Sequence, residues 1–520
     1  MSSSSNKRIA KNTALLYFRM LITMLVSLYT SRIVLNVLGV ENYGIYNVVG
    51  GVVVLFSFLN NAMSVSTSRF LTVELGRKEY DKLNKTFSAA LSIHIGIAIL
   101  VFILAETIGL WFVLNKLVIP DDRMNAAIWV YQFSILSSMV GLTQVPYNAT
   151  IIAHEKMDVY AYVSILDVSL KLIIVFAITW IAGIDKLILY SILIFMVSLT
   201  TAMTYRIYSK RKYAECTYRW NWDKSLYKKM INFSGWSLLS GFAWVMVNQG
   251  SSILINLFFG PAMNAAQAIA IQVNAAISNF VTNFRTAVNP QIIKLYANNE
   301  KEKMFTLVFQ SSVYSYFILL FLILPVFLET DFILSIWLKK PPENAVLFVK
   351  LILIFTLIQT FDAAFVIVLQ AVGRIKENAL LGATLGLLFL LPTTYILFKF
   401  GFQAQALYYI MILNAFILSF GVKPYLLYKI AGMNVKDYLK KVVVPVIKVT
   451  PAAILLPFLI AFYMHEGILR FFILGMVSVL SVSLSVFYIG MDKILRKKII
   501  NTIKLKITIF SNRLNNDKTN

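Results

Sequence analysis

The sequence is poor in the residues that most catalytic and metal sites need. It contains one cysteine, Cys216, and three histidines, His94, His154 and His465. A single cysteine excludes an intramolecular disulfide framework and is compatible with a buried or cytosolic thiol. The chain has no metal-ligand cluster, no phosphate-binding glycine loop and no nucleophile elbow. We therefore expect a protein that is not an enzyme and that carries neither a metal nor a cofactor.

Charged residues are also scarce. They make up 14% of the 520 residues, whereas about 25% is usual in a soluble domain. Hydrophobic residues make up 59%, and the mean hydropathy is +0.74. Apolar runs of about 20 residues recur along the chain, each long enough to cross a hydrocarbon core of about 30 Å. The predicted fold class is an all-α polytopic membrane protein of about fourteen transmembrane helices. The first, near Ala14, is too long for a signal-peptide core and is expected to be retained.

The charges that are present are mostly basic, with 48 Lys and Arg against 24 Asp and Glu and a formal net charge of +24. If the N-terminus is cytoplasmic and the helices alternate, most of these cations fall in inner loops, which also places the C-terminus in the cytoplasm. Such clusters need no partner beyond anionic lipid headgroups, so no nucleic-acid partner is expected. Docking of a cytoplasmic protein on the basic tail is the alternative. The inner clusters are Lys7–Lys11, Arg77–Lys85, Lys210–Lys229, Lys436–Lys441 and the tail from Lys493 onward.

Several landmarks recur at an offset of about 222 residues. Phe87 and Phe309 follow charged inner loops, and the stretches ETIGLW and ETDFILSIW, from Glu106 and Glu329, close the next helix. This repeat predicts two six-helix lobes, related by an axis along the membrane normal because each half has an even number of helices. The predicted parts are an N-terminal lobe (1–209), a basic and aromatic cytoplasmic linker (210–230), a C-terminal lobe (231–428), an additional helix pair (429–490) and a basic cytoplasmic tail (491–520).

The stretch NAAISNFVTNFR, residues 274–285, is unusually polar for a membrane helix. At about 100° per residue, Gln267, Asn274, Ser278 and Arg285 fall on one face. A second stripe on another face consists of Gln272, Asn279, Asn283 and Thr286. Lipid would leave these groups without partners, so they are expected to line a cavity or to join helices.

The first helix carries a similar stripe, in which Asn12, Arg19, Thr23 and Thr30 repeat the 7, 4, 7 spacing. Arg19 and Arg285 are therefore candidates for a cavity site. Arg32 lies on another face, and it and Arg69 are near predicted helix ends, from which an arginine can reach the headgroups.

Other intramembrane charges have competing interpretations. Asp167 and Lys171 are four residues apart and predict a neutral bridge on one helix face. Asp362 is a candidate site for a coupling cation or proton, and a satisfied buried carboxylate is the alternative. An arginine and amide cavity suits an anionic, sugar-bearing substrate, because Arg pairs with phosphate and amides bond to hydroxyls.

The stretches NTALLYFRMLITMLVSLYTSRIVLNVLGVENYGIYNVVGG, RFLTVELGR and VPYNATIIAHEKM resemble the Wzx-type oligosaccharide flippases of O-antigen and capsule pathways. These belong to the multidrug/oligosaccharidyl-lipid/polysaccharide (MOP) exporter superfamily, whose multidrug branch is the MATE transporters. The resemblance covers about the first 430 residues, and the additional helix pair is similar to that of lipid II flippases.

The resemblance implies alternating access and movement of an undecaprenyl-diphosphate-linked oligosaccharide from the cytoplasmic to the periplasmic leaflet of the bacterial inner membrane. It implies that Arg19, Arg32 and Arg285 engage the diphosphate, with Asn274, Ser278, Asn279 and Asn283 beside them. A polymerase or ligase of the same pathway is a candidate partner. The rival functions are a MATE-like cation or drug exporter, for which Asp362 alone is thin support, and a membrane glycosyltransferase or polymerase. The short outer loops, of at most about 16 residues, argue against the second rival.

Overall fold

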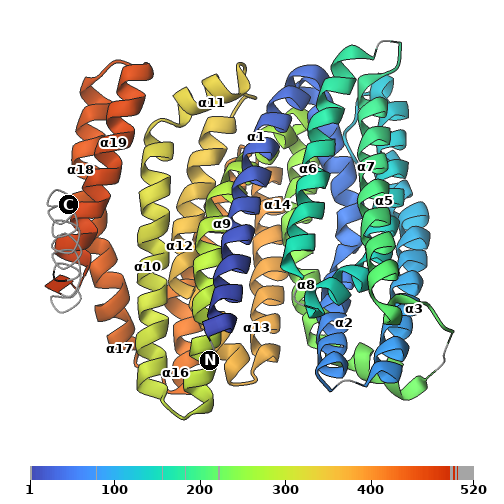
Figure 1. Cartoon of the computed structure of the whole chain (residues 1–520). Coiled ribbons are helices and arrows are strands. Elements are labelled where there is room, and N and C mark those ends of the chain that lie inside the picture. The colour runs from blue at the N-terminus through green and yellow to red at the C-terminus, as the bar shows by residue number, and fades with distance from the viewer. Residues whose placement is uncertain are drawn as a thin grey trace, which may run out of the picture. The chain divides into compact units, whose positions relative to one another are not determined.

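The computed structural model describes residues 3–491 apart from 78, 155, 182 and 221–222, together with 496–497 and 501. It describes side chains from Met20 onward, apart from residues 61, 62, 65, 76, 77, 157, 232–237, 240, 286, 287, 290 and 375. Over the described residues every regular element is a helix and no strand is formed (Figure 1). This confirms the predicted all-α fold class.

Twelve helices in the described part of the chain are long and apolar enough to cross a membrane, so the protein is a multi-pass membrane protein. One of these spans, Met20–Asn60, contains Gly39, whose φ of 81° breaks α1 (Ser3–Val54) into two helices. The 37-residue helix α9 (Pro261–Ala297) is not among the twelve, because its amides lower its hydropathy. Division at Gly39 and inclusion of α9 give fourteen, in line with the approximate number predicted.

The helices pack into two compact units. Unit 1 comprises Met1–Gln272, Leu334–Phe348 and Arg374–Asn414, and unit 2 comprises Val273–Ile333, Val349–Gly373 and Ala415–Asn520. The helices of unit 1, besides α1 and the first part of α9, are α2 (Phe58–Arg77), α3 (Tyr80–Leu104), α4 (Leu110–Asn115), α5 (Met124–Ala153), α6 (Met157–Trp180), α7 (Lys186–Lys212), α8 (Lys224–Phe259), α13 (Ile375–Gly382), α14 (Leu391–Lys399) and most of α15 (Ala406–Phe416). Unit 2 holds the rest of α9 and α10 (Lys301–Leu328), most of α12 (Ala345–Ala371), α16 (Lys423–Ala431), α17 (Val435–Tyr438), α18 (Val444–Tyr463) and α19 (Ile468–Ser485), while α11 (Thr330–Leu338) passes from unit 2 to unit 1. The predicted lobe boundaries stay a prediction.

A polar junction ties the beginnings of two helices together in unit 1. Asp185 caps α7 by accepting hydrogen bonds from the backbone N–H groups of Leu187 and Ile188. The Arg123 guanidinium, at the beginning of α5, donates to both carboxylate oxygens of Asp185 at 2.7 and 3.2 Å, and its Nε donates to Asn42 of α1. Burial raises the pKa of Asp185, but the Arg123 bonds and charge outweigh it and hold that pKa below its ordinary value.

The connection between α7 and α8 is held against unit 1. The Asn84 amide of α3 donates to the backbone carbonyls of Glu215 and Thr217 at 2.9 and 2.8 Å. His154, at the end of α5, contacts the Glu215 carboxylate at 2.6 Å through its Nε2. Cys216, next in the chain, is fully buried, and this burial raises the pKa of its thiol to about 12.

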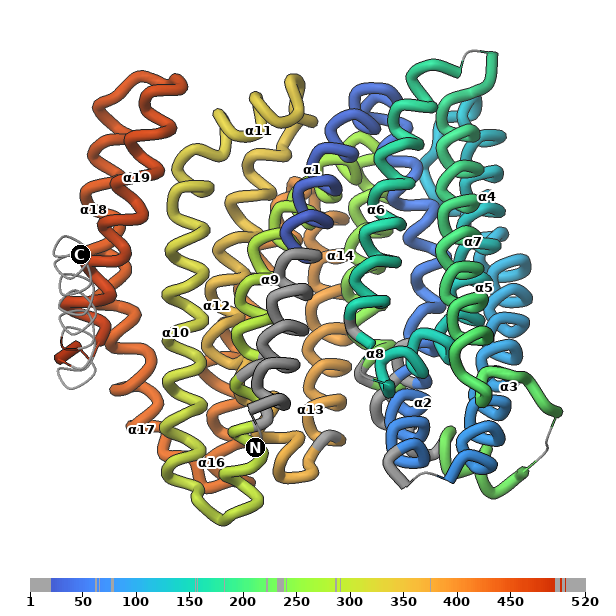
Figure 2. Tube along the Cα trace, in the orientation of Figure 1, coloured from blue at the N-terminus to red at the C-terminus, as the bar shows by residue number. Residues whose placement is uncertain are grey.

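The core of unit 2 lies along α10. Its buried aromatic and aliphatic side chains pack with those of α12, α18 and α19. The C-terminal helices α18 and α19 lie side by side, joined by a short turn (Figure 2). Sequence alone predicts this additional pair but not what attaches it to the rest of the unit.

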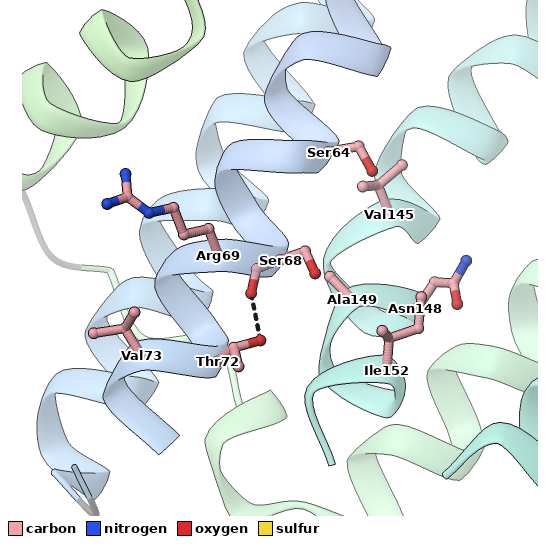
Figure 3. Close-up of a pocket in the computed structure, with 9 residues that line it drawn as sticks. All are labelled: Ser64, Ser68, Arg69, Thr72, Val73, Val145, Asn148, Ala149 and Ile152. Atoms are coloured by element: carbon pink, nitrogen blue, oxygen red, sulfur yellow. Dashed lines mark hydrogen bonds between the residues drawn. The ribbon is translucent and has the colours of Figure 1, made fainter. Parts of the chain in front are cut away.

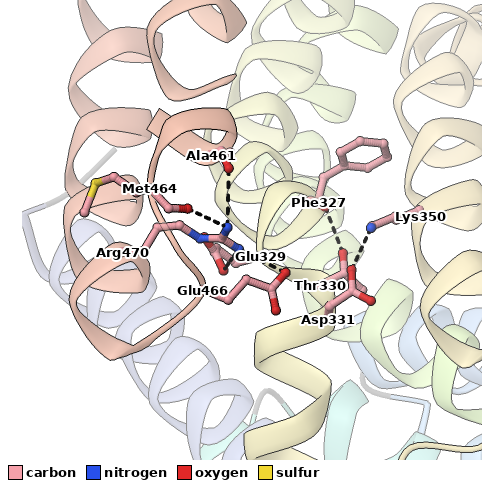
Figure 4. A network of polar contacts seen from close by, with 9 residues as sticks. All are labelled: Phe327, Glu329, Thr330, Asp331, Lys350, Ala461, Met464, Glu466 and Arg470. Atoms are coloured by element: carbon pink, nitrogen blue, oxygen red, sulfur yellow. Dashed lines mark hydrogen bonds and ion pairs between the residues drawn. The ribbon is translucent and has the colours of Figure 1, made fainter. Parts of the chain in front are cut away.

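A buried ion pair makes that attachment. Arg470 of α19 donates from Nε and Nη2 to the two carboxylate oxygens of Glu329, which ends α10, at 2.7 and 3.0 Å (Figure 4). Its Nη1 donates to the backbone carbonyls of Ala461 and Met464. The side chain of Glu329 is 1% exposed and that of Arg470 is 8% exposed. Nearby, Lys350 pairs with Asp331 at 2.8 Å in a far more exposed setting.

Candidate functional site

Part of the predicted polar face of α9 is used within unit 2 itself. The Asn274 side-chain oxygen accepts a hydrogen bond from Thr356 of α12 at 2.6 Å and another from Ser278 at 3.2 Å. The hydroxyl of Thr282 in turn donates to the Ser278 carbonyl. Asn274 thus joins α9 to α12, while Asn279, one residue beyond Ser278, is exposed.

Three charged groups of unit 2 act on one another near the end of this face. Asp362 of α12 forms an ion pair with Lys423 of α16, and both side chains are mostly buried. Arg285 of α9 feels the charge of Asp362, and its Nε is shielded from water without a hydrogen-bond acceptor among the described residues. Because Lys423 neutralises Asp362, the cluster keeps one net positive charge. Of the two interpretations of Asp362, the structure displays the satisfied carboxylate.

The remaining predicted site residues are less informative. The side chain of Arg19 lies outside the described residues, so its predicted role stays a prediction. Arg32 of α1 is half-buried, as is Asn283 of α9. Just before Arg32, Ser31 accepts a hydrogen bond at 2.9 Å from Gln272, a member of the second predicted stripe, which links α1 to α9 within unit 1.

Unit 1 contains a polar groove that the sequence analysis did not predict. Two adjoining cavities of about 530 and 360 Å³ lie along α2 and α5 and share Val145 and Asn148. Both volumes are in the range of roughly 300–1,000 Å³ found for small-molecule sites. We call the two together the α2–α5 groove. Its polar lining residues are Ser57, just before α2, then Asn60, Ser64, Ser68, Arg69 and Thr72, with Ser138, Gln144 and Asn148 of α5.

The groove follows the faces of two helices. In Figure 3, Ser64, Ser68, Val145 and Ala149 lie between α2 and α5, and Arg69 and Asn148 lie at the two outer edges. Positions 57, 60, 64, 68 and 72 repeat every three or four residues, which is the spacing of one helix face. This periodicity is visible in the sequence and could have identified the groove.

The chemistry of the lining is selective. Hydroxyl and amide side chains dominate it, Arg69 supplies a cation, and none of the described residues that line the two cavities is acidic. Such a lining can hydrogen-bond to a neutral or anionic ligand rich in hydroxyl groups. It offers no carboxylate for a cationic drug or a metal ion, and no group of three or more possible metal ligands occurs elsewhere in the described part of the chain.

Comparison with solved structures places the fold. The chain is similar to an inward-closed lipid II flippase MurJ, with 12% identity, a TM-score of 0.68 and coverage of 94% of this chain and 100% of that one. It is similar to an inward-facing multidrug resistance MATE family transporter of the MOP superfamily, with 12% identity, a TM-score of 0.66 and coverage of 80% and 96%. A MOP superfamily transporter from Pyrococcus furiosus, described as having a binding pocket of reverse polarity, aligns at 12% identity with a TM-score of 0.61 over 82% and 96%. At these identities the likeness establishes the fold.

The sequence itself identifies the family. Among curated proteins none matches this chain. The model of the family described as "Polysaccharide biosynthesis protein" matches residues 9–296, which is more than half of the 520 residues. The matched segment contains the whole α2–α5 groove and the polar face of α9. The chain is therefore a member of the polysaccharide biosynthesis protein family with the fold of the MOP transporters.

Proposed function

We propose that this protein is a flippase that moves undecaprenyl-diphosphate-linked oligosaccharides from the cytoplasmic to the periplasmic leaflet of the bacterial inner membrane. The observation that carries the proposal is the family match on a membrane-spanning fold similar to that of a lipid II flippase. The product would serve O-antigen, capsule or another surface polysaccharide. Both termini would lie in the cytoplasm, where the basic loops and tail meet anionic lipids.

The positive cluster of unit 2 supports an anionic substrate. Arg285 retains hydrogen-bond donors, and the Lys423 charge already balances that of Asp362. A guanidinium in this state can bind a diphosphate in bidentate geometry. We assign the diphosphate to Arg285 and to the two arginines of α1, Arg19 and Arg32, and we assign neighbouring hydroxyl contacts to the half-exposed amides of α9. Asp362 could bind a coupling cation only after Lys423 moves away, and we propose it as a coupling site on that condition.

A cation or drug exporter is the second candidate, because the fold is also that of MATE transporters. The chemistry of the described residues favours the flippase. The α2–α5 groove has no acidic lining residue, and Asp362 is occupied by Lys423. A glycosyltransferase or polymerase of the same pathway finds no comparable support in the fold.

The test is the location of lipid-linked oligosaccharides in cells that lack this protein. We expect completed units to accumulate in the cytoplasmic leaflet, and the intact protein to relieve this. Arg285→Ala should restore transport poorly, and Arg285→Lys, which keeps the charge but loses the bidentate fork, should be intermediate. The matched control is Arg374→Ala, which removes an exposed arginine paired with Glu377. Normal arrival of units in the periplasm without the protein would end the proposal.

A further inference from the structure

Two buried amide oxygens line the α2–α5 groove without a hydrogen-bond donor. The side-chain oxygens of Asn60 and Asn148 are shielded from solvent, and no described residue donates to either. Asn60 lines one cavity, and Asn148 lines both. A buried acceptor left unpaired costs about 1–3 kcal/mol. Two such acceptors in one groove indicate that a ligand supplies the missing donors.

The amide group defines the kind of ligand. Each amide presents an acceptor and a donor, and this remains true if the assigned oxygen and nitrogen are exchanged. A hydroxyl group can serve both, since it donates one hydrogen bond and accepts others. An ionised phosphate oxygen only accepts, so it would leave the amide oxygens unpaired. The hydroxyls of Ser64 and Ser68, between the two helices, extend the same preference along the groove.

We propose that the α2–α5 groove binds the sugar part of the substrate through its hydroxyl groups, with Asn60 and Asn148 as the discriminating residues. This assignment depends on the proposed flippase function and makes it more specific. It gives unit 1 a role in recognising the saccharide that is separate from the binding of the diphosphate. The size of the two cavities is sufficient for a small saccharide under the range quoted above.

Hydroxyl groups have other sources in a membrane. A free saccharide and the glycerol headgroup of phosphatidylglycerol both present them. The experiment therefore compares the binding of two lipids to the purified full-length chain in nanodiscs of phosphatidylethanolamine. The probes are undecaprenyl diphosphate carrying one N-acetylhexosamine and bare undecaprenyl diphosphate, with phosphatidylglycerol and a methyl glycoside as competitors.

The intact chain should prefer the sugar-bearing lipid. Asn148→Leu and, independently, Asn60→Leu should weaken its binding about tenfold, as expected for one lost hydrogen bond of about 1.4 kcal/mol. Binding of the bare lipid should stay within about twofold, because the diphosphate contacts are unchanged. Asn115→Leu is the matched control, since Asn115 is exposed on α4 and bonds only to Trp111 of its own helix. Asn148→Ser, which keeps a smaller hydrogen-bonding group, should recover part of the preference and show that the fold is intact.

The outcomes separate the two proposals. If the intact chain prefers the sugar-bearing lipid and both Leu variants keep that preference, the groove assignment is wrong while the flippase function stands. Equal weakening for both lipids would also overturn the assignment, since the groove would then not read the sugar. Displacement of the sugar-bearing lipid by phosphatidylglycerol, or by the methyl glycoside at equal concentration, would replace the lipid-linked sugar as the ligand. If the intact chain binds neither undecaprenyl lipid, the flippase proposal itself fails.

Discussion

Arg470→Ala should strongly destabilise the protein. The change leaves the Glu329 carboxylate, only 1% exposed, without its bidentate partner, and it removes the donor to two backbone carbonyls of the α18–α19 turn. Removal of one partner of a buried ion pair costs about 3–5 kcal/mol, mostly because the other charge stays buried and unpaired. We expect this loss in the free energy of unfolding, measured by denaturant titration of the purified protein with tryptophan fluorescence as the signal.

A nearby pair provides the control. Lys350 and Asp331 form an ion pair of similar length, 2.8 Å, but their side chains are 31% and 53% exposed. Lys350→Ala should therefore cost only about 0–1 kcal/mol. The double variant Arg470→Met with Glu329→Leu removes both charges and should stay close to the intact protein. If Arg470→Ala costs no more than Lys350→Ala, burial of the pair does not control its contribution and the reasoning is refuted.

Further predictions concern other charged and nucleophilic groups. Cys216 should resist maleimide labelling, because a pKa of about 12 instead of the ordinary 9.0 reduces its thiolate about 1,000-fold at neutral pH. Asn84→Ala, which frees the connection after α7, should speed this labelling, and mass spectrometry of the only cysteine would reveal an unchanged rate if the connection is held otherwise. Lys423→Ala should lower the thermal unfolding temperature far more than Lys423→Met combined with Asp362→Leu, because only the first leaves a buried unpaired carboxylate. The pKa of Asp185 is lowered in the folded state, so Asp185 stabilises the protein above its ordinary pKa and loses this effect as the pH falls through its folded pKa. Asp185→Asn should thus lower stability at pH 7 and flatten its decline between pH 5 and pH 3, and an unchanged pH profile would contradict the role of the Arg123 junction.

The length and composition of the apolar runs were sufficient to predict an all-α membrane fold, because only helices or closed barrels satisfy the backbone in lipid. Local pairs were also predictable. Asp167 and Lys171, four residues apart on α6, form the expected bridge at 2.8 Å. Pairs that depend on which helices become neighbours were not, since Asp362 and Lys423 are 61 residues apart and Glu329 and Arg470 are 141 apart.

The α2–α5 groove illustrates a different difficulty. Serine and threonine in membrane helices often bond to a carbonyl of their own helix, as Thr72 does to Ser68. A polar face built from them has the same pattern whether it lines a cavity or satisfies itself. The arginines drew attention to α1 and α9, whereas the groove depends on Asn60 and Asn148, whose unpaired oxygens become evident only when their surroundings are known.

The Glu329–Arg470 pair also has an evolutionary consequence. Glu329 ends α10, but its partner belongs to a helix 141 residues later in the chain. A related gene that lost the segment encoding α18 and α19 would leave this carboxylate stranded in an apolar setting. The acidic codon at this position and the C-terminal hairpin should therefore be inherited or lost together, so that one residue in the middle of the sequence records whether the last two helices are present.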